Sequence, residues 1–339
     1  MSQTLHNELI VIDGLQYSNW NREIFEQLHA GGVTMVHATI VYHEQIRETL
    51  LRIAQWNRHF ENNGDLIMPV KGTSDIRRAK ELGKVGVMFG AQNCSSIEDD
   101  IGMIEIMREL NLMIMQLTYN NQSLLACGCY EAEDSGVTRF GRQAIAEMNR
   151  VGMVVDMSHS GERSTLEAIE ISERPIVISH ANPTSFHAAK RNKSDTVLKE
   201  LGDSGGLLGF SLYPFHLKNG SDCTLDDFCD MVARTAELMG VTQIGIGTDL
   251  CQDQPVDILE WMRNGRWSKA MDYGEGSKNN ASWPQSLPWF KDSRDFPNIT
   301  TGLLARGFTA DDVARIMGLN WLNFLEDALP ANSEQKVAH

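Results

Sequence analysis

Basic residues are scarce in this chain. Its 339 residues include 30 Lys and Arg against 45 Asp and Glu, a formal net charge of −15 with a pI near 5.1. An excess of negative charge repels a phosphate backbone and an anionic membrane surface, so we expect no nucleic acid and no membrane as partner. No cationic segment followed by an apolar core opens the sequence, and no hydrophobic tail closes it. We therefore expect a cytoplasmic protein with a small-molecule ligand.

Paired cysteines are also missing. The six cysteines form no CxxC motif, and a chain of this length does not need disulfides, so we expect free thiols. Cys127 and Cys129 make a CxC, which is a weak metal signal. Cys94 follows an expected strand near the start of a helix, where a thiolate is stabilised, but a lone cysteine without a placed base is more typical of a rim or core position.

Apolar strand-like runs alternate with amphipathic helices along the whole chain, and nothing resembles a linker. This alternation predicts a parallel sheet with right-handed crossovers. We therefore treat residues 1–330 as one domain and residues 331–339 as a tail. The nine runs are one more than a closed eight-stranded barrel needs, and the short, Pro-containing third run is the weakest. They cover Leu9–Ile12, Val33–Thr39, Leu66–Val70, Val85–Phe89, Leu112–Thr118, Met153–Asp156, Ile176–Ser179, Gly206–Phe210 and Gln243–Ile246.

Helix signals fill most intervals and take over at the C-terminus. Helices are predicted at 43–62, 97–110 and 139–151, and after Thr224, where a cap precedes acidic first-turn residues. Near the end of the chain, Thr309 begins a helix by a good cap, Gly318 ends it, and residues 320–329 form a helix that closes the fold.

One long irregular stretch lies between Cys251 and Pro297. Loops of this length in a compact domain are often functional, so we interpret 251–297 either as an aromatic lid over the strand ends or as a packed excursion or subunit contact. A homo-oligomer is therefore compatible with the sequence. The aromatic residues of the stretch are Trp261, Trp267, Tyr273, Trp283, Trp289 and Phe290.

Two histidines stand directly after neighbouring strands, His159 in MVVDMSHS and His180 in PIVISHANP. Parallel strands deliver such side chains to one rim, and two imidazoles there indicate a metal or acid/base site. The alternative is that each histidine caps its strand and bonds a backbone carbonyl. His37, in VTMVHAT, also ends a strand and is a further candidate ligand, although a position at the barrel bottom or facing a helix fits at least as well.

The order of motifs resembles one known family. GMVVDMSH, then RPIVISHANP, the Arg191-Asn192 pair in AAKRNKSD, GIGTD ending at Asp249, and IMGLNWLNFL are similar to the renal (membrane) dipeptidases, peptidase family M19 of the amidohydrolase superfamily. The resemblance covers nearly the whole chain. It implies a distorted (β/α)8 TIM-type barrel with extra C-terminal helices and a site at the carboxyl ends of the strands.

The resemblance also implies two zinc ions, and four positions depart from that pattern. Leu15 and Tyr17 stand where the family has a His-x-Asp pair of ligands, and Gln92 stands where a glutamate bridges both metals. Tyr119 stands where a substrate-contacting histidine is expected. Leucine donates no electron pair, a tyrosine phenol is normally protonated, and an amide carries no charge. We therefore expect a degenerate centre with at most one zinc ion per chain.

The remaining matches keep part of the chemistry. By resemblance, His159 and His180 bind one zinc, Arg191 with Asn192 contacts the substrate carboxylate, and Asp249 serves the other metal and proton transfer. An arginine fork suits a carboxylate because it grips both oxygens at once.

Three interpretations follow for the incomplete centre. His159, His180 and Asp249 form a single catalytic zinc site with water; or a histidine acts as general base with Asp249 or Tyr119 as acid, without metal; or the protein only binds a ligand. We expect a hydrolase of a small carboxylate-bearing amide or dipeptide. The alternative is a catalytically inactive or metabolite-binding relative.

Overall fold

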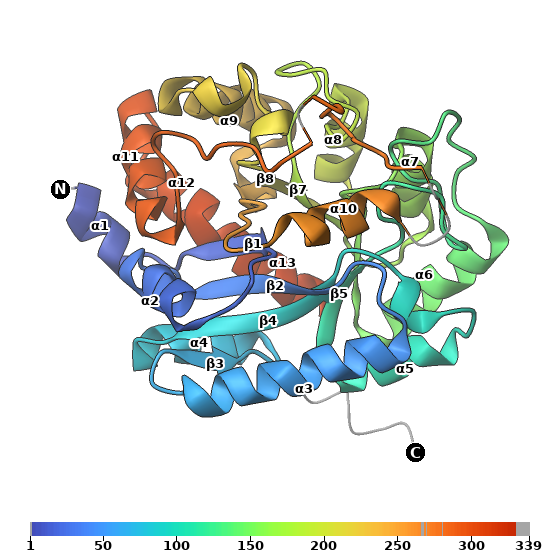
Figure 1. Ribbon diagram of the computed structural model, residues 1–339. Coiled ribbons are helices and arrows are strands. Elements are labelled where there is room, and N and C mark those ends of the chain that lie inside the picture. The colour runs from blue at the N-terminus through green and yellow to red at the C-terminus, as the bar shows by residue number, and fades with distance from the viewer. Residues whose placement is uncertain (1, 266–267, 269, 280, 330–339) are drawn as a thin grey trace.

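A computed structural model describes residues 2–265, 268, 270–279 and 281–329, and it confirms the barrel. Eight parallel strands follow one another in sheet order (Figure 1). Backbone bonds from Asp249 N to Leu15 O (3.0 Å) and from Tyr17 N to Leu250 O (3.1 Å) nearly close the ring. The strands are β1 (Ile12–Gln16), β2 (Met35–Val41), β4 (Val85–Ala91), β5 (Leu112–Gln116), β6 (Val154–Asp156), β7 (Val177–Ala181), β8 (Leu207–Phe210) and β9 (Ile244–Ile246).

The weak third run is the strand outside the ring. β3 (Ile67–Pro69) pairs only with the first half of β4, along the edge whose second half pairs with β5. The first strand corrects our expectation, because β1 begins at Ile12, where the predicted run ended. Asp13 and Gln16 are buried inside β1 and bond to each other, with Gln16 Nε2 donating to Asp13 Oδ2 at 2.7 Å. Polar residues buried inside the barrel therefore made this strand look like a loop.

Helices cover the barrel between the strands. The Thr224 cap is confirmed, since its side chain accepts from Asp227 N at 3.1 Å, and α6 begins and ends as predicted. Two predicted helices are shorter than expected, because their first residues belong to the loops that follow β2 and β4. The helices are α1 (Ser2–Glu8), α2 (Arg22–Ala30), α3 (Ile46–Asn62), α4 (Thr73–Leu82), α5 (Gly102–Glu109), α6 (Arg139–Val151), α7 (Glu162–Ile171), α8 (Asp195–Asp203) and α9 (Leu225–Met239).

The C-terminal helices seal one end of the barrel. They are α11 (Phe296–Arg306), α12 (Ala310–Ala314) and α13 (Asn320–Ala328), and Thr309 with Asp312 forms a capping box. Gly318 ends the helical run as predicted, because its backbone (φ 178°, ψ −27°) is not helical and kinks the chain before α13 begins at Asn320. The Trp321 indole fills the barrel floor so closely that a Cβ at Gly14 would lie 2.1 Å from it.

The 251–297 stretch is less irregular than predicted, because it contains α10 (Val256–Asn264). Figure 1 shows α10 lying over the barrel among the loops that follow the strands. Trp289 and Phe290 instead pack into the core beside Phe228 and Phe296. Trp267 and the 331–339 tail lie outside the described residues.

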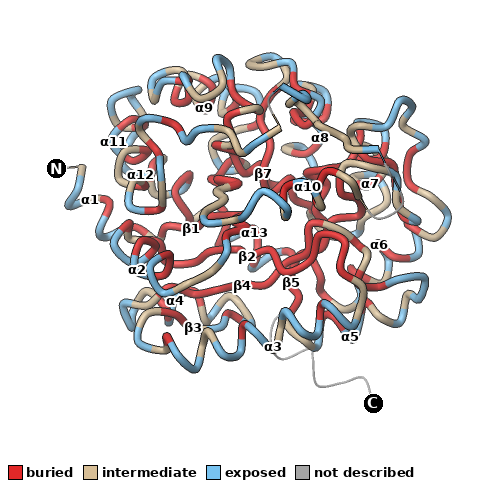
Figure 2. Tube along the Cα trace, viewed as in Figure 1, coloured by how far each residue is buried: buried red, intermediate tan, exposed pale blue. Residues whose placement is uncertain are grey.

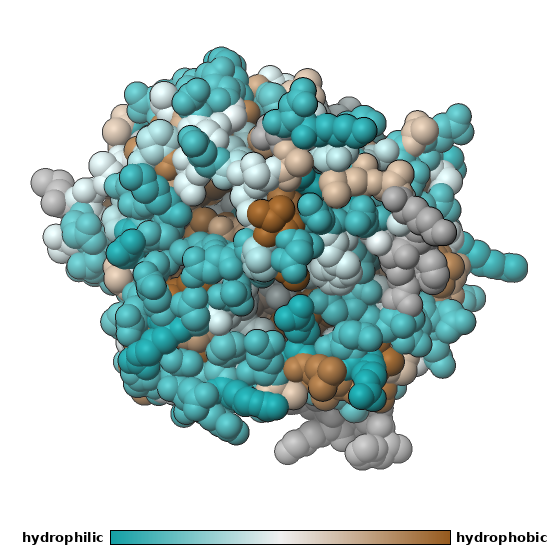
Figure 3. All heavy atoms as spheres, viewed as in Figure 1, coloured by the Kyte–Doolittle hydropathy of each residue, from teal (hydrophilic) through white to brown (hydrophobic). Residues whose placement is uncertain are grey.

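Burial follows the architecture. The eight strands of the ring are buried along their length, whereas the surrounding helices alternate between buried and exposed faces (Figure 2). The face seen in Figure 3 is mostly hydrophilic, with hydrophobic residues scattered over it. No helix among the described residues combines the length and apolarity needed to cross a bilayer. The six cysteines are free thiols.

Candidate active site

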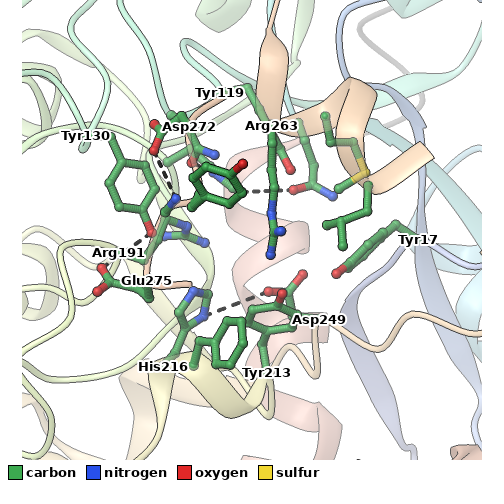
Figure 4. A pocket seen from close by; sticks show the side chains of 18 of the residues that line it. Tyr17, Tyr119, Tyr130, Arg191, Tyr213, His216, Asp249, Arg263, Asp272 and Glu275 are labelled. Atoms are coloured by element: carbon green, nitrogen blue, oxygen red, sulfur yellow. Dashed lines mark hydrogen bonds and ion pairs between the residues drawn. The ribbon is translucent and has the colours of Figure 1, made fainter. Parts of the chain in front are cut away.

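A cavity of about 560 Å³, counting the open space at its mouth, lies at the carboxyl ends of the strands. Figure 4 shows the labelled side chains converging on a central space from the strand ends and from α10. The lining includes Tyr17, Gln92, Tyr119, Asn120, Tyr130, His159, Arg191, Tyr213, His216, Asp249, Met262, Arg263, Asp272, Tyr273, Glu275 and Trp283.

The structure brings His159 and His180 together. Their Nε2 atoms are 3.0 Å apart, and His159 Nε2 is also 2.9 Å from Gln92 Oε1. His159 lines the cavity, whereas His180 lies behind it and is fully buried. Burial, followed by the charge of Arg191, lowers the pKa of both imidazoles well below 6.5. Both rings are therefore neutral at neutral pH, the form in which a histidine can accept a proton.

A buried carboxylate supports the pair from inside the barrel. Ser179 Oγ donates to Asp156 Oδ2 at 2.5 Å and lies 2.7 Å from His180 Nδ1. Asp156 Oδ1 accepts from Ser158 N at 2.9 Å and from Ser158 Oγ at 2.6 Å. Hydrogen bonds thus run without interruption from Asp156 to His159.

Arg191 lines the same cavity and is 2% exposed. Its Nη1 donates to Ser158 O and its Nη2 to His180 O, so the guanidinium bridges the loop after β6 and the strand β7. Arg191 Nε is buried and has no partner among the described residues.

Asn192, predicted to contact substrate, does not line the cavity. Its Oδ1 accepts from Asn182 N, and its Nδ2 donates to His187 O and His216 O. These bonds fix the loop that presents Arg191, so we expect Asn192 to act through position.

Asp249 forms a second acid/base group of the cavity. Its φ of 58° is in the left-handed region, and its side chain is 3.9 Å from His216 Nδ1. Burial, only partly offset by Arg191, raises the pKa of Asp249 from 3.8 to about 8. Burial also lowers the pKa of His216 well below 6.5. Near neutral pH the two are therefore a contact between neutral groups, and Asp249 carries a proton that it can donate.

Aromatic packing occupies the positions where the resemblance implies metal ligands. Leu15, Tyr17, Tyr42, Tyr119 and Met262 form a buried cluster, and burial raises the pKa of Tyr17 well above 10. The Tyr119 ring stacks on the His159 imidazole with centroids 4.2 Å apart. These phenols remain protonated, so this side of the cavity is a hydrophobic wall.

The donor atoms do not fit a two-metal centre. His159 Nε2, His180 Nε2 and the neutral oxygen of Gln92 meet at one point, and Asp249 does not join them. Over the described ranges, no group of three or more His, Cys, Asp or Glu side chains lies close enough to hold a metal ion. His159, His180 and Asp249 are thus not brought together as such a group, and the single zinc site inferred from them stays a prediction.

The remaining candidates lie outside the cavity. His37 lies within β2, where its Nδ1 is 2.6 Å from Gly14 O and its ring lies against Gly90 inside the barrel. Cys94 is buried, and burial raises the pKa of its thiol to about 11, so it is not activated. Cys127 Sγ donates to Glu133 O at 3.2 Å. Cys129 is likewise kept protonated by burial, which raises the pKa of its thiol.

Sequence reasoning missed four residues at or beneath this site. His216 follows β8 as His159 follows β6, so the same strand-end rule would have found it. Asp156 was visible as a carboxylate ending a buried strand, two residues before a serine-histidine pair. Tyr213 and Arg263 had no signal, because nothing local indicates that α10 carries Arg263 over the cavity.

Comparisons with known proteins identify the family of this chain. The family model described as membrane dipeptidase (peptidase family M19) matches residues 19–264. Dipeptidase tcpJ of Claviceps purpurea is 23% identical over 87% of this chain, and dipeptidase aclJ of Aspergillus oryzae is 24% identical over 85%. The chain spans only 63% and 62% of the length of these two relatives.

Solved structures agree with the fold. An amidohydrolase from Pseudomonas aeruginosa superposes with a TM-score of 0.92 at 38% identity, over 97% of this chain and 99% of that one. A metallopeptidase from Rhodobacter sphaeroides, solved with a phosphinate mimic of L-Ala-D-Ala, superposes with a TM-score of 0.79 at 14% identity, over 94% and 99% of the two chains. At that identity the second match supports the fold alone.

Proposed function

Because this chain belongs to the membrane dipeptidase family, peptidase family M19, we propose that it hydrolyses a small carboxylate-bearing amide or dipeptide with at most one metal ion. One observation carries the proposal: His159, Asp249 and Arg191 line one small cavity, in which burial lowers the pKa of the imidazole and raises the pKa of the carboxyl. Groups whose pKa values are displaced in opposite directions supply a base and an acid at one pH.

The roles follow from position and charge. The free edge of Arg191 binds the substrate carboxylate, and the aromatic wall of Tyr17 and Tyr119 excludes water from one side. His159 accepts a proton from water, whose oxygen attacks the amide carbon. Asp249 donates its proton to the departing nitrogen as the C–N bond breaks. The net result is addition of water across the amide, and no step depends on a metal ion.

The experiment is a hydrolysis screen over dipeptides and acylated amino acids with protein purified without added zinc. His159→Asn should lower kcat by roughly 10²- to 10⁴-fold, the usual contribution of a general base. His29→Asn is the matched control, since His29 is exposed and bonds Gly83 O at 3.0 Å. Equal activity of H159N and wild type would contradict the proposal.

Metal analysis of the same preparation tests the other half of the proposal. We expect zero or one equivalent of zinc per chain, because Gln92 carries no charge to hold two dications together. Two tightly bound equivalents per chain would contradict it.

A ligand-binding protein is the second candidate, favoured by the aromatic cluster that fills the ligand positions. Saturable binding of a dipeptide by wild type, without turnover of any substrate in the screen, would select this alternative.

A further inference from the structure

A second arginine reaches the cavity from the helix that lies over it. Arg263 is in the last turn of α10, lines the same cavity as Arg191, and is only 8% exposed. Figure 4 shows its side chain reaching from the α10 side toward Tyr213 and Asp249. The charge of Arg263 acts there, because it partly offsets the rise that burial causes in the pKa of Tyr213. Two guanidinium groups, carried by different elements, therefore line one small space.

The partners that the protein gives Arg263 carry no opposite charge. Its Nη1 donates to Ala281 O at 2.5 Å, and its guanidinium carbon lies 5.9 Å from the centre of the Tyr273 ring. No carboxylate of a described residue forms an ion pair with it; the one such contact found for Asp249 in the described part of the chain is with His216, at 3.9 Å. An arginine side chain stays charged in proteins, and a charge removed from water needs an opposite charge to offset the lost hydration. The contacts hold this guanidinium in place without neutralising it.

Two carboxylates on the segment after α10 also line the cavity, and both have partners of their own. Asp272 Oδ1 accepts from Gly274 N at 2.9 Å. Glu275 Oε1 accepts from Lys190 N at 2.5 Å and from the Tyr130 hydroxyl at 3.3 Å. Both acidic residues are partly exposed, so water hydrates them at the rim. They therefore leave the guanidinium on α10 to a ligand.

Arg191 and Arg263 are held by separate parts of the fold. Arg191 bonds carbonyls of the loop after β6 and of β7, whereas the Arg263 carbonyl accepts from Asp272 N at 3.0 Å in the segment that follows α10. A ligand with a single carboxylate neutralises one of the two groups, and a ligand with two carboxylates can neutralise both. A site with a buried charge rejects an analogue that leaves this charge unpaired, and complementary charge is therefore a source of specificity.

We propose that Arg263 is a specificity-determining residue that selects substrates with a second carboxylate, such as a dipeptide that contains an aspartyl or glutamyl side chain. The inference deepens the proposed function and rests on it, because that function assigns the first carboxylate to Arg191. The second carboxylate binds Arg263, and its negative charge replaces the counter-ion that the protein does not supply.

Calorimetric titration with four dipeptides measures the preference. Ala-Asp differs from Ala-Asn by a carboxylate in place of an amide, and Asp-Ala and Asn-Ala place the same difference on the other side of the peptide bond. The titrations use His159→Asn, in which slow turnover spares the ligand. The aspartyl member of at least one pair should bind roughly 10- to 100-fold more tightly, the usual effect of a hydrogen bond to a charged group. Equal affinities within both pairs, or no saturable binding of an aspartyl peptide, would overturn the proposal.

Arg263→Gln, added to His159→Asn, should abolish the preference. Arg263→Lys should retain most of it, because the positive charge stays. A loosened α10 weakens the binding of every ligand alike, so the ratio of the two affinities within a pair separates recognition of charge from loss of structure. An unchanged ratio in R263Q would contradict the proposal.

Arg108→Gln is the matched control. Arg108 is also 8% exposed and donates from Nε to a backbone carbonyl, Gly152 O, at 2.9 Å, but it does not line the cavity. R108Q should keep the ratio. Loss of the ratio in R108Q as well would mean that removing any buried guanidinium has this effect, and the role of Arg263 would fall.

NMR of the chain with nitrogen-15 in its arginines decides the matter if R263Q fails to fold. The Nε–H signal of Arg263, assigned by its loss in R263K, should move when the preferred aspartyl peptide is added. It should move much less with the asparaginyl member of the pair at equal occupancy. Equal shifts with both peptides would overturn the proposal.

Neither readout needs turnover, so the two proposals can fail separately. A preference for an aspartyl peptide that is lost in R263Q, in a protein that hydrolyses nothing in the screen, would end the proposed function and leave Arg263 as the determinant of ligand choice. Hydrolysis of both members of each pair with equal kcat/KM would support the proposed function and overturn this inference.

Discussion

Arg191 combines support of the backbone with recognition of a ligand. Its two Nη groups hold carbonyls of Ser158 and His180, while Nε is free. Arg191→Lys should weaken binding of dipeptides by about 1 to 3 kcal/mol, because an ammonium offers no planar fork. The melting temperature should fall too, because the carbonyl bonds are lost. Calorimetric titration with a dipeptide and with its C-terminal amide checks this, since the amide should lose much less affinity.

Asp249 makes a pH-dependent contribution to stability. Its pKa rises from 3.8 in the unfolded chain to about 8 in the folded protein, so folding is penalised increasingly as pH rises through that window. Asparagine has no such penalty and tolerates a φ of 58°. The melting temperature of Asp249→Asn relative to wild type should therefore increase from pH 5 to pH 8. Scanning calorimetry at several pH values checks this, and a constant or falling difference would contradict it.

The strand-end rule explains which residues of the candidate site were visible in the sequence. His159 and His180 stand at strand ends, so the local pattern alone placed them near one rim, whereas Asp249 was identified from the resemblance to the family. The hydrogen-bond chain through Ser179 was not predictable, because it depends on side-chain directions across two strands. Reading Asn192 as a ligand contact failed for the same reason, since its amide turns toward its own backbone.

At the scale of elements, the position of α10 over the site could not be predicted from the hydrophobic periodicity of the sequence. Arg263 ties it down, with Nη1 donating to Ala281 O at 2.5 Å and its carbonyl accepting from Asp272 N at 3.0 Å. Its guanidinium also lies over the Tyr273 ring. A helix held by few contacts opens more readily than the barrel beneath it.

Arg263→Ala should therefore speed amide hydrogen exchange in α10 and weaken ligand binding, while exchange in β4 and β5 stays as in wild type. Hydrogen-exchange mass spectrometry with peptide resolution checks this. Arg22→Ala is the control, since Arg22 makes exposed ion pairs with Glu26 and Asp65 far from α10. Faster exchange across the whole barrel would mean global destabilisation instead.

The boundaries of helices and strands show where tertiary contacts override the preferences of the local sequence. The helix at 139–151 was predicted to the residue because a cap and a glycine bracket it. Residues 12–16 were not predicted as a strand. The buried Asp13 carboxylate is stabilised there by a hydrogen bond from Thr248, which follows β9, the last strand of the ring. Gly318 was predicted as a helix end, and the chain does kink there; a Cβ at this position would also lie 2.2 Å from the Ile10 carbonyl, so the close approach is what requires glycine.

On the scale of the whole molecule, the Trp321 indole lies against both the first and the last strand of the barrel. Gly245 and Gly209 give it room, since a Cβ at these positions would lie 2.7 and 3.2 Å from the indole. Trp321→Ala should lower the free energy of unfolding by about 3 to 5 kcal/mol, the usual cost of a large-to-small change in a core. Urea denaturation checks this. Trp261→Ala is the control, being only partly buried, and an equal loss there would contradict the argument.

The barrel itself was readable from the nine alternating runs, and we propose that residues 1–330 act as one domain. What the sequence did not reveal is how its floor is made. The indole that fills the barrel belongs to α13, almost the last described element, whereas Gly14 belongs to β1, the first strand.

This arrangement has a consequence for synthesis on the ribosome. Every strand emerges before the residue that fills their common centre, so a nascent chain has eight strands and an unfilled middle until its last helix is released. Contacts between such distant parts of a chain form late and slowly. A message truncated shortly before codon 321 would therefore yield a chain with all its cavity-lining groups and no finished interior, a substrate for chaperones and proteases.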